Sequence, residues 1–365
     1  MKRIHTAVLI IVAVCIVATG TTFGILIFTT WGELDYENTY YYESTSPSSI
    51  ERININTDIG SILINYNNTP TNYYAKIDLD IHIEGILVKG SSFSDFFYPI
   101  LWENESTPLT SFTLDAKATT WFIFGFAQQI QINLTLRTDV IYDLNILSST
   151  GAINLNVPDN IIMNNTILGT STGSVFLNAA KNTTFQGDVK LSTSTGAVSL
   201  YATHANFTHD VISYTSTGNI VLNFSKCSIG GHLRGTVSTG SIGFNSYNME
   251  YSEGYNWRLE SSTGNIGVNI LQYTDMGANV TGSISTSTGT INVYYKDNLA
   301  NIGAKFTCST STGSNNYTPI GTGGFSVSGV NPKTITSNDY NSTSNKYTFT
   351  ASTSTGNNNI QAESL

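Results

Sequence analysis

The chain has 365 residues and a formal net charge of −9 at pH 7, with 40% hydrophobic and only 11% charged residues. The hydrophobic share is enough to build a core and excludes an intrinsically disordered chain. The acidic balance excludes a nucleic-acid-binding role, because phosphate binding needs clustered Lys and Arg. The sequence has no basic patch beyond Lys2 and Arg3.

An uncharged apolar segment follows this basic pair. Residues 7–28 carry no charge, and as a helix they would be roughly 33 Å long, enough to cross a hydrocarbon core of ~30 Å. The positive-inside rule predicts a cytoplasmic tail over residues 1–6, a transmembrane helix over 7–29 and an extracellular remainder. The alternative is a cleaved signal peptide, whose apolar region is normally shorter, about 7–15 residues. We therefore expect a single-pass protein of the cell membrane.

Two segments precede the repetitive part of the chain. Residues 30–50 are acidic, rich in Tyr and end in a Ser/Pro cluster, a composition typical of a spacer. Residues 51–147 are interpreted as an N-terminal β module or cap. The module opens with a degenerate copy of the repeat around Gly60, and its aromatic run at 121–126 is expected to cover an open end of the repeats.

Residues 148–365 are dominated by one repeat. The tripeptide Ser-Thr-Gly recurs nine times at intervals of 22 to 25 residues, except for a final interval of 43. We interpret the long interval as two periods, with one copy that lacks the tripeptide. The nine glycines are Gly151, Gly173, Gly196, Gly218, Gly240, Gly264, Gly289, Gly313 and Gly356.

Apolar residues flank each glycine with the period of two that half-buried strands require. Around Gly196, for example, Leu191 precedes the glycine, and Val198 and Leu200 follow it. No single copy can bury its apolar face, whereas stacked copies bury a continuous core. We predict an all-β fold, a parallel β-helix-like β-solenoid with rungs of 22–25 residues, with an antiparallel meander as the alternative.

Polar residues of the repeat have predicted places in such a stack. Paired threonines before the glycine, such as Thr193 and Thr195, are expected to point inward or into the bend. Asparagines recur five residues after the glycine, and stacking would place their amides in a hydrogen-bonded ladder. These ladder asparagines are Asn65, Asn156, Asn178, Asn223, Asn245 and Asn269.

One polar column is the candidate for a metal or catalytic site. Its members are Asp188, His209, Asp210, His232 and Glu253, which fall 13 to 15 residues after their glycines. Neighbouring rungs would bring them about 4.8 Å apart, close enough to chelate a divalent ion or to perform acid–base chemistry. The alternative is an exposed turn where polar residues gather. We favour the turn, because no rung supplies a tight ligand cluster, and assign no catalytic, cofactor or metal residue.

The cysteines of the repeats are predicted to be free, buried thiols. Cys227 and Cys308 fall about four rungs apart, roughly 19 Å along the stack. A disulfide requires Cα atoms within about 7 Å of each other.

The stretch ININTDIGSILIN near the start and the blocks STSTGAVSLYA, TSTGNIVLNF and STSTGTINVYY resemble the putative-adhesin family of bacterial and archaeal surface proteins. The resemblance runs from about Ile50 to Ile360. It implies a solenoid of β-strand repeats at the cell surface and supplies no functional residues.

Together these features predict a membrane-anchored, non-enzymatic surface protein with an adhesin-like or structural role and no cofactor. Its expected partners are the membrane, through residues 7–29, and glycans or other surface proteins. Two alternatives remain open: a polysaccharide-active enzyme that uses the polar column, and a membrane-tethered accessory or sensor ectodomain. The sequence contains no phosphate-binding loop, nucleophile elbow or zinc-binding helix motif.

Overall fold

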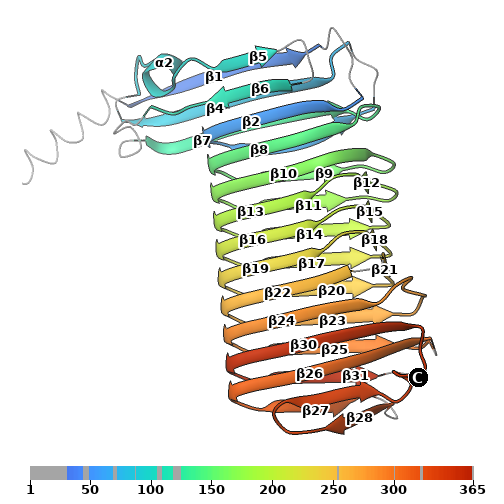
Figure 1. The fold of residues 1–365 in the computed structure, drawn as a ribbon. Coiled ribbons are helices and arrows are strands. Elements are labelled where there is room, and N and C mark those ends of the chain that lie inside the picture. The colour runs from blue at the N-terminus through green and yellow to red at the C-terminus, as the bar shows by residue number, and fades with distance from the viewer. Residues whose placement is uncertain are drawn as a thin grey trace, which may run out of the picture.

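The computed structural model describes residues 31–43, 49–68, 72–86, 88–104, 109–117, 125–252, 255–299, 301–320 and 324–363. The predicted tail and transmembrane helix, residues 1–6 and 7–29, lie outside these ranges, as do Cys15 and residues 121–124. None of the helices in the described part is long and apolar enough to cross a membrane. The described chain consists almost wholly of strands, which confirms the all-β prediction (Figure 1).

Each copy of the repeat forms a rung made of one strand, a bend at the glycine and a second strand. The strands before the bend form the pre-glycine sheet, and those after it form the post-glycine sheet. The pre-glycine strands are β2 (Glu51–Ile59), β8 (Tyr142–Thr150), β10 (Ile162–Thr172), β13 (Val189–Thr195), β16 (Val211–Thr217), β19 (Leu233–Thr239), β22 (Tyr255–Thr263), β24 (Val280–Thr288), β26 (Ile302–Thr312) and β30 (Asn345–Thr355). The post-glycine strands are β3 (Ser61–Asn67), β9 (Ile153–Val157), β11 (Val175–Ala179), β14 (Val198–Thr203), β17 (Ile220–Ser225), β20 (Ile242–Tyr247), β23 (Ile266–Gln272), β25 (Ile291–Asp297), β27 (Asn315–Pro319) and β31 (Asn358–Glu363).

Neighbouring rungs pair in parallel and in register, which places equivalent side chains above one another. Val198 of β14 lies between Val175 and Ile220 of the adjoining rungs, and all three are fully buried. Four short strands line a third side of the stack, and there the rings of Phe185 and Phe207 stack with centroids 4.9 Å apart. These strands are β12 (Thr184–Phe185), β15 (Asn206–Phe207), β18 (Ser228–Ile229) and β21 (Glu250–Tyr251).

The bend requires glycine for two reasons. The nine bend glycines have φ between +138° and +149°, a region that side chains with a Cβ avoid. Each also sits against the glycine of the adjoining rung: a Cβ on Gly218 would lie 1.8 Å from the carbonyl oxygen of Gly196. The hydroxyl three residues before the bend donates to the adjoining glycine carbonyl, as from Thr193 to Gly173 at 2.9 Å. The first threonine of each pair is therefore buried, whereas the second, such as Thr195, is exposed.

The N-terminal module extends both sheets. In the post-glycine sheet, β7 (Gly125–Arg137) pairs with β3 in parallel, and β4 (Ala75–Ile86) and β1 (Trp31–Tyr42) follow in antiparallel order. In the pre-glycine sheet, β6 (Leu109–Leu114) pairs with β2 and β5 (Leu101–Asn104) pairs with β6. The short helix α2 (Phe93–Phe96) lies beside these strands.

The predicted spacer over residues 30–50 differs from the structure. Residues 31–42 form β1, which pairs with β4 along its whole length. Leu34 and Tyr42 of this strand are buried, and the ring of Tyr36 stacks on Phe93 with centroids 4.3 Å apart. The burial of Leu34 and Tyr42 therefore holds this segment in the sheet, although its composition is acidic and typical of a spacer.

The final interval of 43 residues does not contain an additional rung. Its middle part forms an antiparallel hairpin, β28 (Phe325–Ser328) and β29 (Lys333–Ser337), in which β29 pairs with the edge strand β26. The chain then turns back, and β30 inserts between β24 and β26 (Figure 1). The Gly289 amide bonds to the Thr355 carbonyl, and the Gly356 amide to the Thr312 carbonyl. The last rung in sequence is therefore the last but one in space.

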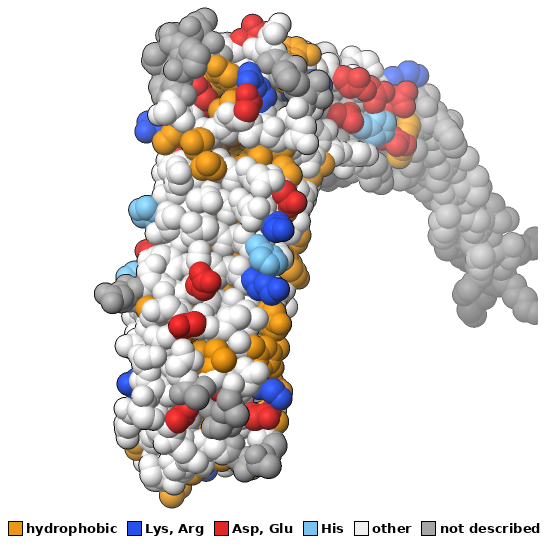
Figure 2. All heavy atoms as spheres, turned by 90° about the vertical axis from the view of Figure 1, so that its right-hand side faces the viewer, with side chains coloured by type: hydrophobic (Ala, Val, Ile, Leu, Met, Phe, Trp, Pro, Cys, Tyr) orange, Lys and Arg blue, Asp and Glu red, His pale blue; other side chains and the backbone are white. Residues whose placement is uncertain are grey.

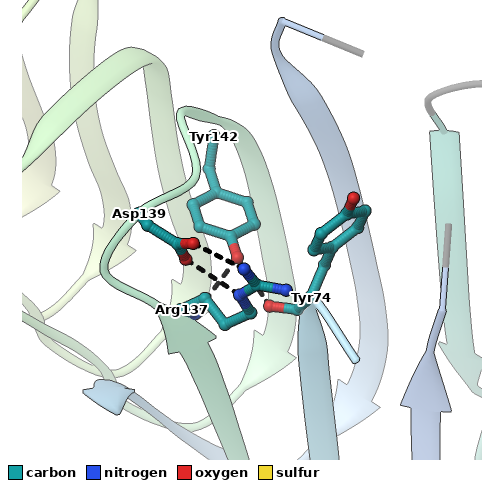
Figure 3. A network of polar contacts seen from close by, with 4 residues as sticks. All are labelled: Tyr74, Arg137, Asp139 and Tyr142. Carbon is teal, nitrogen blue, oxygen red and sulfur yellow. Dashed lines mark hydrogen bonds and ion pairs between the residues drawn. The ribbon is translucent and has the colours of Figure 1, made fainter. Parts of the chain in front are cut away.

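A polar network secures the turn between β7 and β8 (Figure 3). The guanidinium of Arg137 donates from Nε to Asp139 at 2.8 Å and lies over the ring of Tyr74, 5.0 Å from its centroid. The hydroxyl of Tyr142 donates to the Tyr74 carbonyl at 2.5 Å and accepts from the Arg137 amide at 3.1 Å. These contacts fix the module against the first repeat.

Candidate functional site

The polar column from the sequence is brought together by the fold, but its carboxylates bond to the backbone. Asp188 accepts from the amide of Asp210 at 3.2 Å, and Asp210 accepts from the amide of His232 at 2.7 Å. The same pattern begins two rungs before Asp188: Asp143 accepts from the Asn165 amide at 2.9 Å, and Asn165 accepts from the Asp188 amide at 3.0 Å. Each side chain thus satisfies a backbone donor of the next rung at a turn.

The remaining members of the column do not add a ligand set. His209 Nδ1 lies 2.9 Å from the hydroxyl of its neighbour Thr208, and Glu253 lies outside the described residues. No group of three or more His, Cys, Asp or Glu side chains able to hold a metal occurs in the part of the chain that the structure describes. This column fits the alternative reading, a polar turn.

A second polar set lies on the outer face of β4 and of its neighbour β1, because buried and partly exposed residues alternate along β4. His82 Nδ1 is 2.6 Å from Asp35 of β1, and this contact raises the pKa of His82 above its usual value. Glu84 lies 3.8 Å from the other ring nitrogen. All three side chains are exposed by a third or more, so they form a solvated face of the module.

The outer face of the post-glycine sheet carries a different arrangement, in the column five residues after each glycine. Tyr201, Asn223, Asn245, Asn269 and Tyr294 are neighbours in that order on five consecutive rungs. Asn245 donates to Asn223 at 2.6 Å, which confirms the predicted amide ladder at this pair. Two tyrosines therefore bracket three stacked amides.

A hollow of about 420 Å³ opens beside this column, because Gly243 and Gly267 occupy adjacent rungs there. These glycines differ from those of the bends. A Cβ on either would meet only a backbone oxygen at 4.0 Å, and neither has a positive φ that disfavours a side chain. The fold would accept side chains at both positions, so the hollow is not a requirement of the backbone. Its lining comprises Gly243, Asn245, Gly267, Val268, Asn269, Asn292, Val293, Tyr294, Asn359 and Gln361.

The far side of the hollow is formed by a second amide ladder that the sequence analysis missed. Asn359 donates to Asn292 at 2.9 Å, and Asn316 donates to Asn359 at 2.9 Å. These residues stand three positions after their glycines in the last three copies, a recurrence visible in the sequence. Their spatial order also depends on the inserted rung β30–β31, which the sequence did not reveal.

A smaller depression of about 240 Å³ adjoins the hollow on the same face. Asn245 and Asn269 line both, and Tyr201, Tyr247 and Leu271 extend the smaller one. Tyr201 and Tyr247 are 39% and 37% exposed. The two depressions form one continuous surface, defined here as the tyrosine–amide face.

This face is uncharged. None of the residues that line the two depressions is acidic or basic. The ion pair Lys296–Glu363, with 2.8 Å between its charged atoms, borders the face, because Lys296 is the register neighbour of Leu271 on the adjoining rung. On the side of the stack that carries the short strands, charged side chains are scattered and form no large patch (Figure 2). The arrangement suits a neutral ligand with many hydroxyl groups better than an ionic one.

The pre-glycine sheet offers hydroxyls instead of amides. A depression of about 400 Å³ there is lined mainly by Ser and Thr, with Asn331 at one side. Tyr214 is 40% exposed on this sheet and donates to, or accepts from, Ser216 at 2.9 Å. It has no aromatic partner across an amide column comparable to that of Tyr201.

Both cysteines of the repeats are free and buried, as predicted. Burial raises the pKa of the Cys227 thiol to about 11 and that of the Cys308 thiol to about 12. Neither thiol is a candidate nucleophile, since nucleophilic thiols need a lowered pKa.

No family model and no curated protein matches the chain. Among solved structures, the chain is similar to a "putative cell adhesion protein" from Clostridium sporogenes ATCC 15579, with 13% identity, a TM-score of 0.26, and coverage of 90% of this chain and 100% of that one. It is also similar to a "putative adhesin" from Bacteroides fragilis NCTC 9343, with 10% identity, a TM-score of 0.34, and coverage of 90% and 97%. At these identities and TM-scores, neither likeness carries an argument about what this chain binds.

Proposed function

We propose that the chain is a membrane-anchored extracellular β-solenoid with a non-enzymatic, adhesin-like role, and that it binds its partner through the tyrosine–amide face. The observation that carries the proposal is the in-register column from Tyr201 to Tyr294 beside a hollow that the backbone does not require. Tyr201 is exposed and Tyr294 half-buried, and tyrosine side chains are enriched at recognition surfaces.

The placement outside the cell rests on the sequence. Lys2 and Arg3 precede the apolar segment 7–28, and the positive-inside rule then directs the repeats outward. The non-enzymatic role is supported by the polar column, whose aspartates bond to backbone amides of the next rung. A polysaccharide-active enzyme would need carboxylates free to face a substrate.

The experiment uses cells that produce the full-length chain. A membrane-impermeant amine reagent added to intact cells should label the lysines of the repeats, such as Lys190 and Lys226, and leave a tag on the N-terminus unlabelled. Labelling of the repeats only after lysis would refute the placement. Turnover of a polysaccharide by the purified chain, lost in His209→Ala or His232→Ala, would instead establish the enzyme alternative.

A further inference from the structure

We infer that the tyrosine–amide face is a binding site for a neutral polysaccharide chain, which lies along the stack from Tyr201 to Tyr294 and enters the hollow over Gly243 and Gly267. This inference deepens the proposed function and rests on it for the choice of surface. It adds the chemical class of the ligand, the direction in which the ligand lies and the residues that contact it.

The direction follows from the register. Tyr201 and Tyr294 occupy the same column and are separated by four rung steps, about 19 Å along the stack. The amides of Asn223, Asn245 and Asn269 fill the interval at every step. Asn245 also bonds to Asn223, and the amide oxygen of Asn269 is buried, so the three amides offer different groups to a ligand. A ligand with regularly spaced polar groups can still meet an amide on each of these three rungs, whereas a compact small molecule would use only one or two.

The ligand class follows from the chemistry of the contacts. A tyrosine ring offers an apolar face to the C–H groups of a sugar ring, and an amide offers both donors and an acceptor to sugar hydroxyls. The side chains lining the two depressions carry no charge, so they supply no charged partner for a sulfate, phosphate or uronate group. A neutral glycan meets all these conditions.

The hollow supplies depth at the middle of the track. At the equivalent position, the adjoining rungs carry Val221 and Asn292, whereas Gly243 and Gly267 leave room. The hollow of about 420 Å³ lies within the range of ligand sites, about 300–1,000 Å³. Because a Cβ fits at both glycines without a clash, their small size is free to serve binding.

The same property makes the site testable without unfolding the chain. Gly243→Thr and Gly267→Thr fill the hollow with a residue that favours strands, so both variants should melt at or above the temperature of the parent chain. Tyr201→Ala and Tyr294→Ala remove the two ends of the track. Tyr214→Ala is the matched control for Tyr201→Ala, because Tyr214 is 40% and Tyr201 39% exposed and Tyr214 lies on the opposite sheet.

The assay titrates the full-length chain with neutral hexasaccharides of glucose, mannose and N-acetylglucosamine, and with an acidic hexagalacturonate, by isothermal calorimetry. At least one neutral sugar should bind, with hexagalacturonate weaker. Each Gly→Thr variant should weaken binding by tenfold or more, each of the two track tyrosine variants by about tenfold, and Tyr214→Ala should leave it unchanged.

Three results would overturn the inference. They are binding of none of the neutral sugars, tighter binding of hexagalacturonate, and equal binding by the Gly→Thr variants and the parent chain. None of these would refute the extracellular, non-enzymatic role, which depends on the surface-labelling and turnover measurements. Failure of the labelling experiment, in turn, would leave a measured sugar affinity standing, so the two proposals fail separately.

Discussion

The bend glycines support the sharpest stability prediction. In Gly218→Ala the new Cβ would lie 1.8 Å from the Gly196 oxygen, and this oxygen would have to retreat by about 1.2 Å to reach 3.0 Å. The φ of +144° adds strain of about 1–3 kcal/mol for a residue with a Cβ. Overpacking in a closely stacked interior adds about 1–3 kcal/mol. We expect the unfolding free energy to fall by about 4 kcal/mol.

The assay is urea unfolding of the full-length chain, followed by circular dichroism in the β region. Gly243→Ala is the control, since its Cβ meets only a backbone oxygen at 4.0 Å. That variant should be neutral or more stable by about 0.4–1 kcal/mol, because alanine restricts the unfolded chain. If Gly218→Ala unfolded at the same urea concentration as Gly243→Ala, the stacking of glycine on glycine would be refuted.

Three further predictions test the polar contacts of the rungs. Thr193→Val removes the hydroxyl that donates to the adjoining bend carbonyl and should lower the unfolding free energy by about 1 kcal/mol. Val237→Thr adds a hydroxyl at the equivalent position of another rung and should raise the unfolding free energy of the parent chain by a similar amount. Asp210→Ala should cost about 1.5–3 kcal/mol, because a charge-assisted bond to a backbone amide is lost, and Asp210→Asn should cost less; a melting temperature lowered by a chelator would contradict this structural role. In a Cys15→Ser variant, Cys227 and Cys308 should react with a thiol reagent at pH 8 only on unfolding, because pKa values of about 11 and 12 leave about a thousandth of the first thiol and about a ten-thousandth of the second ionised; rapid reaction of the native chain would refute their burial.

Much of the repetitive fold follows from the sequence, since the repeat dictates local structure. Glycine at a fixed spacing with apolar residues two and four positions later determines which side chains face inward, as Val198 and Leu200 show. The buried, unpaired state of Cys227 and Cys308 follows from the same geometry. These features depend on one rung and its immediate neighbours.

The order of the rungs does not follow from the repeat. Every rung presents the same backbone edges and nearly the same core. The repeat pattern therefore allows the rung of Gly356 to lie either at the end of the stack, after the rung of Gly313, or between two earlier rungs. Its insertion between the rungs of Gly289 and Gly313 depends on the hairpin β28–β29 and on the lengths of the connections. The strand β1 was missed for a related reason, because its partner β4 lies more than 30 residues away.

The candidate site was predictable only in part. The asparagine column was visible in the sequence as a ladder, and Tyr201 and Tyr294 stand at the same position, five residues after Gly196 and Gly289. The sequence analysis did not connect them with the ladder. Gly243 and Gly267 are ordinary strand residues by sequence, and only the space around them distinguishes them from the bend glycines. For the polar column around Asp210, the sequence identified the side chains that lie together. It did not show that the aspartates accept hydrogen bonds from backbone amides of the next rung.

The central claim concerns where a neutral sugar chain lies on the molecule. A crystal structure of the full-length chain with the tightest-binding neutral hexasaccharide tests that claim most directly. Sugar density should follow the column from Tyr201 to Tyr294 and descend over Gly243 and Gly267. Density on the hydroxyl-lined pre-glycine sheet, or across the stack instead of along it, would contradict the account.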